Sequence, residues 1–218
     1  MKEKYFTHEN IYSESMKMLR KLSNSHGSRK NYKIGKNTAL LIIDMQNYFL
    51  EEDSHAFVAS AHAIIPGIKS LIHACQKKGL PVIFTKHTNN DENAGSLSGW
   101  WNDLIRENTR QCGIYTDFKT DDSIIIEKHQ YDAFYQTELN EILKKLKINQ
   151  VIVTGVLTHL CCETTVRSAF VNGYDILFPI NGTATYNKKY HKNSLVNLSH
   201  GFAVPVLMED IITKIEKL

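Results

Sequence analysis

The side chain best suited to covalent chemistry is Cys161, which follows the β-branched run from Val151 to Thr154 and a short turn that begins with a glycine. The run predicts a buried strand, and the residues after the turn predict a helix with Cys161 in its first turn. A thiol there faces unpaired backbone N–H groups and the positive end of the helix dipole, which favour the thiolate. The same N–H groups could hold a developing oxyanion. We therefore expect Cys161 to be a catalytic nucleophile.

Two more reactive side chains follow apolar runs of the same kind. Asp44 comes directly after residues 38–43, and Lys128 comes shortly after residues 123–126. A carboxylate can accept the proton of a thiol, and an ammonium can stabilise both the carboxylate and the thiolate. At ~4 Å and an effective dielectric constant near 20, such an attraction is worth about 4 kcal/mol, which can shift a thiol pKa by a few units. Asp44, Lys128 and Cys161 thus suffice for covalent hydrolysis without a histidine.

Alternating strands and helices must bring these three residues together. Apolar strands are expected at 38–43, 81–85, 123–126, 151–154, 174–179 and 204–208, and helices at 64–78, 138–146, 161–172, 191–199 and 211–218. The strands are apolar throughout, as expected when helices cover both faces of a sheet. The pattern predicts an α/β, doubly wound, three-layer fold with a six-stranded parallel sheet. Ligands of such sheets bind outside the carboxyl ends of the strands, where the reactive residues are expected.

Length and charge limit the remaining possibilities. The 218 residues are most simply one folded domain over 38–218, preceded by a polar, basic arm over 1–37 that packs on the domain or on a neighbouring subunit. A formal net charge of +3 gives no reason to expect nucleic acid or membrane binding. No apolar run approaches a membrane span or a secretion signal. The four cysteines show no metal-ligand spacing, so a reduced, cytoplasmic protein is expected.

Three segments resemble the motif regions of one known family. Asp44-Met-Gln-Asn-Tyr-Phe49, Glu127-Lys128 and Gly155-Val-Leu-Thr-His-Leu-Cys161 are similar to those of the isochorismatase-like cysteine hydrolases, which include nicotinamidases and N-carbamoylsarcosine amidases. The resemblance covers roughly residues 37–210 and implies the Rossmann-like, six-stranded fold expected above. It also implies that Asp44 is the general base and later acid, that Lys128 stabilises charge, and that Cys161 attacks a carbonyl.

The same resemblance implies details of the site. It places a cis peptide bond between Val156 and Leu157, and an oxyanion hole made by the backbone N–H groups of Leu157 and Cys161. Side chains near the expected strand ends could bind the substrate. These candidates are Phe49, His87, Trp100, Tyr131 and His159.

A metal is not expected. Nicotinamidases bind one through Asp-x-His and a second His, located beyond the first strand and its helix. Here Asp53, His55 and His62 lie too close to the first strand, and the end of the second strand offers His87 with no carboxylate beside it. We therefore expect no metal and no cofactor, which argues against nicotinamide as the substrate.

Three functions follow from these residues. The first is hydrolysis of a small amide or carbamoyl C–N bond through a thioester, on a small-molecule substrate, by a homo-oligomer (dimer or tetramer). The second is vinyl ether hydrolysis by Asp44 without the thiol, because enzymes that cleave isochorismate resemble this chain at Tyr131-Asp-Ala-Phe134 and His159 but carry Gly at the position of Cys161. The third is a non-catalytic role in protein association or thiol redox chemistry. The thiol favours the first.

Overall fold

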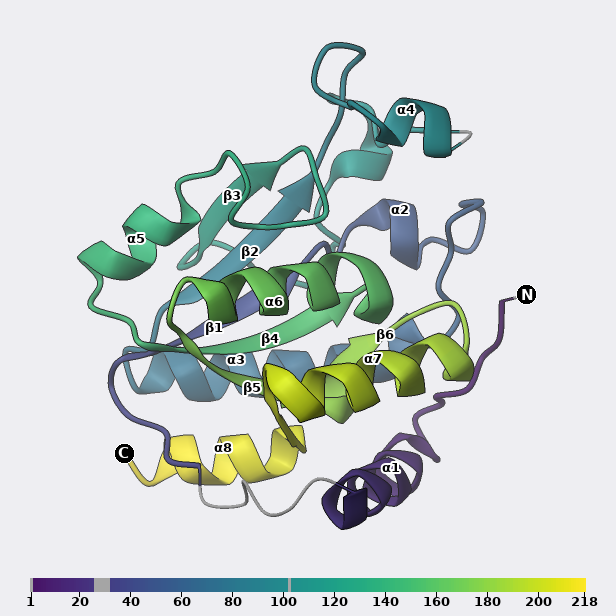
Figure 1. Cartoon of the computed structure of the whole chain (residues 1–218). Coiled ribbons are helices and arrows are strands. Elements are labelled where there is room, and N and C mark those ends of the chain that lie inside the picture. Colours follow the sequence, from purple (N-terminus) through teal and green to yellow (C-terminus); the bar gives the residue numbers. More distant parts are fainter. Residues whose placement is uncertain (1, 26–31, 102) are drawn as a thin grey trace.

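A parallel β-sheet forms the centre of the computed structural model, which describes residues 2–25, 32–101 and 103–218 (Figure 1). Six strands lie in the order β3-β2-β1-β4-β5-β7, and a short seventh, β6, pairs with β4. The expected doubly wound α/β fold is thereby confirmed, although the two-residue strand β6 was not expected. The strands are β1 (Thr38–Ile43), β2 (Val82–His87), β3 (Ile124–Lys128), β4 (Gln150–Val156), β5 (Asp175–Pro179), β6 (Thr183–Ala184) and β7 (Val204–Val206).

Helices cover both faces of the sheet. Figure 1 shows α6 in front of the sheet and α3 behind it. In the described part of the chain, no helix is long and apolar enough to cross a membrane. The α-helices are α1 (Ile11–Ser25), α2 (Asn47–Leu50), α3 (Ile65–Lys77), α4 (Leu97–Trp100), α5 (Leu139–Lys145), α6 (Glu163–Val171), α7 (Lys188–Gly201) and α8 (Met208–Glu216).

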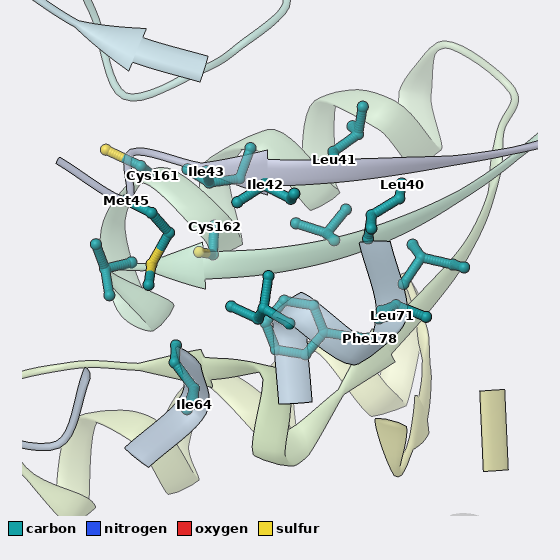
Figure 2. Packing of buried hydrophobic residues seen from close by; sticks show 14 of the residues in the cluster. Leu40, Leu41, Ile42, Ile43, Met45, Ile64, Leu71, Cys161, Cys162 and Phe178 are labelled. Carbon is teal, nitrogen blue, oxygen red and sulfur yellow. The ribbon is translucent and has the colours of Figure 1, made fainter. Parts of the chain in front are cut away.

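The central strands are buried on both faces, which explains their unbroken apolar sequences. Every residue of β1 and of β4 is buried. Figure 2 shows the side chains of β1 packed with residues such as Phe178 of β5. Cys162 points in among these side chains, whereas the sulfur of Cys161 points away from them.

The strand register sets the layout of the carboxyl ends. Ile43 of β1 pairs with Gly155 of β4, and His87 of β2 pairs with Lys128 of β3. The segment after β4 differs from the expected helix start, because Cys161 lies in a π-helical turn, Thr158–Cys162, that precedes α6. This wider turn directs side chains differently from an α-helix of the same length.

Gly155 occupies a position that no side chain can share. Its φ is +108°, and a Cβ placed there would lie 2.1 Å from the backbone oxygen of Ile43. The neighbouring atom belongs to the backbone of the central strand, so it cannot move aside cheaply.

We therefore expect Gly155→Ala to lower the free energy of unfolding by about 2 to 4 kcal/mol, measured by urea denaturation. Gly201→Ala is the control, because a Cβ there meets nothing within 4 Å. A Gly155→Ala protein as stable as the control variant would contradict this packing.

Candidate active site

Asp44 leaves the end of β1 in a left-handed conformation, with φ +48°, which Asp tolerates better than most residues. Its side chain is fully buried. The backbone N–H of Asp44 donates to Thr85 Oγ1 at 3.0 Å, and the Thr85 hydroxyl donates to Asp44 Oδ1 at 2.6 Å. Thr85 lies in β2, next to β1, so this two-way contact holds the carboxylate at the carboxyl edge of the sheet.

Lys128, the last residue of β3, brings a fully buried ammonium to the same place. Its Nζ lies 2.8 Å from Asp44 Oδ2, 3.1 Å from His87 Nδ1 and 3.5 Å from Cys161 Sγ. It also donates to the Gln130 carbonyl at 2.9 Å. The three residues that the sequence predicts to be catalytic are thus brought together around one ammonium group.

Burial and the ion pair act on the pKa values of both charged groups in opposite senses. Burial alone would raise the pKa of Asp44, but the neighbouring Lys128 ammonium outweighs it and the pKa is lowered. Burial alone would lower the pKa of Lys128, but Asp44 and then Cys161 outweigh it and the pKa is raised. Both groups are therefore charged at neutral pH.

Asp44 Oδ2 keeps capacity to accept a proton. It contacts the Lys128 ammonium at 2.8 Å, yet it makes no well-directed hydrogen bond within the described part of the chain. The ion pair holds without that hydrogen bond, because the attraction between two charges needs no fixed angle. A carboxylate oxygen of Asp44 and the Sγ of Cys161 lie within 4.8 Å of each other, so this carboxylate is placed to take the thiol proton.

The expectation that Cys161 rests as a thiolate is wrong. Burial raises the pKa of the Cys161 thiol, and the Asp44 carboxylate adds to the rise, while the Lys128 ammonium only partly offsets it. The helix-dipole effect expected from the sequence is therefore outweighed by loss of solvation. The thiol is not sealed from solvent, because Cys161 is 5% exposed and lines a cavity.

His87 is neutral and fully engaged. Burial lowers its pKa to about 4, with a further contribution from the Lys128 ammonium. Its Nδ1 faces Lys128 Nζ and therefore accepts, which assigns the ring proton to Nε2, 2.8 Å from Asn89 Oδ1. His87 lines the cavity, but neither ring nitrogen is left for a substrate, so it orients Lys128.

The donor set does not fit a metal ion. Among the described residues, one group of His, Cys, Asp and Glu side chains converges, namely Asp44, His87 and Cys161. The Lys128 ammonium lies against the same three side chains, so a built-in cation already holds the central position. His62, weighed above as a possible ligand, instead bonds the Leu50 carbonyl through Nε2.

A cavity of about 70 Å³ opens onto Cys161. Of the predicted substrate contacts, Phe49, His87 and Tyr131 line it. Aromatic rings make up much of its wall, and His55, Asn89 and Asp103 add polar groups to the lining. The lining that the sequence did not predict includes Tyr48, His55, Asn89, Leu97, Trp101, Asp103, Ile105 and Tyr186.

Two predicted contacts lie outside this cavity. Trp100 is 77% exposed and does not line it, whereas the next residue, Trp101, does and donates to the Tyr131 hydroxyl at 2.7 Å. His159 also lies outside, because its Nδ1 is 2.6 Å from Thr185 Oγ1 and its ring stacks on Tyr190 at 4.4 Å. Thr85, which bonds Asp44, was not among the predicted site residues. The sequence could have indicated it, because Thr85 lies in a strand beside that of Asp44.

The two residues predicted to form an oxyanion hole, Leu157 and Cys161, lie just before and within the π-helical turn. The peptide bond between Val156 and Leu157 is cis, as the resemblance implied. Leu157 and Cys161 both line the cavity, and no acceptor in the described residues takes the Leu157 N–H. The Leu157 N–H is therefore available as a donor beside the cavity, as an oxyanion site would need.

Comparisons with known proteins identify the family. Residues 38–210 match the Isochorismatase domain family, so the chain belongs to that family. The chain is 38% identical to Nicotinamidase 3 of Arabidopsis thaliana over 181 residues, covering 81% of this chain and 87% of that protein. It is 27% identical to the Isochorismatase of Bacillus subtilis, covering 81% of this chain but only 57% of that protein.

A solved structure supports the fold. The cysteine hydrolase from Pseudomonas syringae pv. phaseolicola superposes with a TM-score of 0.83 at 21% identity, covering 86% of this chain and 96% of that chain. The family expected from the three motifs is confirmed by these matches.

Replacing Lys128 by Met should lower the free energy of unfolding by about 3 to 5 kcal/mol at neutral pH, because it leaves a buried carboxylate without a partner. With Lys128, the lowered pKa of Asp44 stabilises the fold above its ordinary value of 3.8, and this is lost as pH falls through the lowered pKa. Without Lys128, burial raises that pKa, and stability falls as pH rises through it. The deficit should therefore be larger at pH 8 than at pH 5, measured by urea denaturation.

Lys144→Met is the matched control, because Lys144 is exposed near the end of α5. Its stability should differ little from that of the wild type at both pH values. An equal deficit for Lys128→Met at both pH values would contradict the assigned charge of Asp44.

The ultraviolet absorbance of the thiolate tests the resting state of Cys161. Because burial raises the pKa of this thiol, the absorbance difference between wild type and Cys161→Ala should stay flat from pH 6 to pH 8. Both proteins keep Cys75, Cys112 and Cys162, so these cancel in the difference. A titration step with a midpoint below neutrality would instead indicate a resting thiolate.

Proposed function

We propose that this protein is a cysteine hydrolase that cleaves the C–N bond of a small, non-peptide amide or carbamoyl group through a thioester. The observation that carries the proposal is the convergence of the buried Asp44 and Lys128 on Cys161, which lines a cavity. A base, a charge stabiliser and a nucleophile in contact are the parts that covalent hydrolysis needs.

The first half of the reaction begins from a neutral thiol. Asp44 takes the proton of Cys161 as the sulfur attacks the substrate carbonyl carbon. The carbonyl oxygen becomes an oxyanion, held by the N–H groups of Leu157 and Cys161. The C–N bond then breaks, the proton passes from Asp44 to the leaving nitrogen, and an amine or ammonia departs.

The second half uses the same carboxylate. Asp44 removes a proton from water, and the oxygen attacks the thioester carbonyl. Collapse of this second intermediate breaks the C–S bond, returns the proton to the sulfur and releases a carboxylic acid. Lys128 keeps Asp44 ionised between steps by its contact at 2.8 Å.

Amide hydrolysis is favoured over vinyl ether hydrolysis. The chain keeps a thiol in contact with the buried ion pair, and vinyl ether cleavage by Asp44 would not require it. The relative named Nicotinamidase 3 matches at higher identity and over more of its length than the relative named Isochorismatase. A redox or purely structural role would leave the buried Asp44–Lys128 pair without a use.

The cavity supports a small, flat substrate. A volume of about 70 Å³ limits the substrate to a small molecule, and aromatic walls favour planar groups. The Tyr131 hydroxyl accepts from Trp101, so its own proton is free for a substrate acceptor. Although the sequence argued against nicotinamide, the named relative makes it one amide that must be tested.

The proposal also includes a homo-oligomer, supported by apolar side chains left in solvent. Val171 at the end of α6 is 82% exposed, and Trp100 is 77% exposed. Isolated exposed apolar residues are common, and a second copy of the chain could cover either of these two.

Cys161→Ala should lower kcat by about 10⁴-fold or more on the best substrate in a panel of small amides, because it removes the nucleophile. Intact-mass spectrometry of the quenched wild type should show an acyl adduct that the variant lacks. Cys162→Ala is the matched control and should form the adduct, because its sulfur faces the core. Turnover that survives in Cys161→Ala, on an amide or on isochorismate, would reject the thioester route.

A further inference from the structure

The segment before α1 packs against the rest of the molecule. Residues 2–6, called here the strap, lie outside the family match, which begins at residue 38. Phe6 is fully buried and Tyr5 is 5% exposed. Their backbone N–H groups both donate to Ser60 Oγ, at 3.1 and 2.9 Å. Figure 1 shows this segment running past β6 toward α1, on the side of the molecule where the loop after α2 lies.

The strap joins two walls of the cavity. The Glu3 N–H donates to the Tyr186 carbonyl at 2.7 Å. The Lys2 ammonium donates to the His55 carbonyl and lies 5.2 Å from the centre of the Tyr186 ring. Tyr186 and His55 line the cavity from segments about 130 residues apart in sequence, so the strap fastens one wall to the other.

The hydroxyl of Tyr5 contacts two buried residues, Thr185 and His191. It accepts the Thr185 N–H at 3.0 Å, and the same oxygen lies within hydrogen-bond distance of His191 Nδ1, also at 3.0 Å. The same His191 nitrogen lies 3.1 Å from Thr158 Oγ1. Thr158, Thr185 and His191 are fully buried, so these polar groups have no water to replace a lost partner.

Thr158 begins the turn that carries the predicted oxyanion hole. It follows Leu157 directly, and the N–H groups of Leu160 and Cys162 both donate to the Leu157 carbonyl, at 3.1 and 3.2 Å. The hydrogen-bonded side chains around Tyr5 contact the turn at a second residue, because Thr185 Oγ1 lies 2.6 Å from His159 Nδ1. A shift at Thr158 would therefore move the Leu157 N–H relative to the Cys161 sulfur.

We propose that the strap is a working part of the active site, in which the Tyr5 hydroxyl acts as a positioning group for the turn that holds Leu157 and Cys161. The inference rests on the proposed amide hydrolysis for its kinetic consequence. The geometric part stands on the contacts of Tyr5 with Thr185 and His191 alone.

Tyr5→Phe removes only this hydroxyl and tests the proposal. On the best amide, kcat should fall roughly tenfold with KM changed less than twofold, because a small displacement of oxyanion donors acts on the transition state. Alkylation of Cys161 by iodoacetamide passes through no oxyanion, so its rate should stay within twofold of wild type. Tyr174→Phe is the matched control, since Tyr174 is 6% exposed and its hydroxyl bonds Asn140 at 2.9 Å, away from the turn.

Several outcomes would overturn the proposal. A Tyr5→Phe protein with unchanged kcat would do so, and so would a loss of kcat matched by an equal loss of Cys161 alkylation, which would indicate support of folding only. Thr158→Val removes the hydroxyl on the other side of His191 and should give the same split between kcat and alkylation. If Tyr5→Phe does not fold, kcat and the alkylation rate of Thr158→Val test the proposal in its place.

Backbone hydrogen exchange separates failure of this inference from failure of the proposed function. If the wild type hydrolyses no amide, the proposed function fails, and exchange over residues 157–162 then tests the strap without a substrate. Exchange there should be faster in Tyr5→Phe than in wild type or Tyr174→Phe. Equal exchange in all three proteins would overturn the positioning role.

Discussion

The ion pair between Asp44 and Lys128 is the constraint on which the rest of the structure depends. Both groups are fully buried, and each is tolerable only because the other lies 2.8 Å away. The remaining polar atoms need partners as well, and Thr85, His87 and the Gln130 carbonyl supply them. Three adjacent strands must therefore keep a single register at their carboxyl ends, which is a demand on the fold as much as on the site.

This pair also decides how the sulfur is used. In this buried site the Lys128 ammonium already balances the Asp44 carboxylate, so a second anion would be poorly compensated and the Cys161 thiol rests neutral. In the proposed mechanism, Asp44 becomes neutral by taking the thiol proton as the sulfur attacks, and the negative charge passes through the sulfur to the substrate oxygen. The net charge around Lys128 then stays constant through attack, and the buried site undergoes little reorganisation.

Features that depend on neighbouring residues could be predicted from the sequence, whereas features that depend on distant segments could not. A polar residue at the end of a buried run placed Asp44 and Lys128, because strand ends in parallel sheets converge. Trp101 lines the cavity and Trp100 does not, and the loop that holds them has no periodicity from which the direction of either side chain could be predicted. His159 lies outside the cavity, where Thr185 and Tyr190 hold its ring, and both contacts come from a distant segment. The thiolate expectation failed because burial depends on distant segments.

The strap has a consequence for when the site is completed. Its contacts join Tyr5 to Thr185 and His191, across 180 and 186 residues of chain. Closing so long a loop costs entropy that local helices and neighbouring strands do not pay, so such contacts form late in folding. A chain that emerges from the ribosome in order could thus make these contacts only after His191 has been synthesised, and shorter products would carry Cys161 without them.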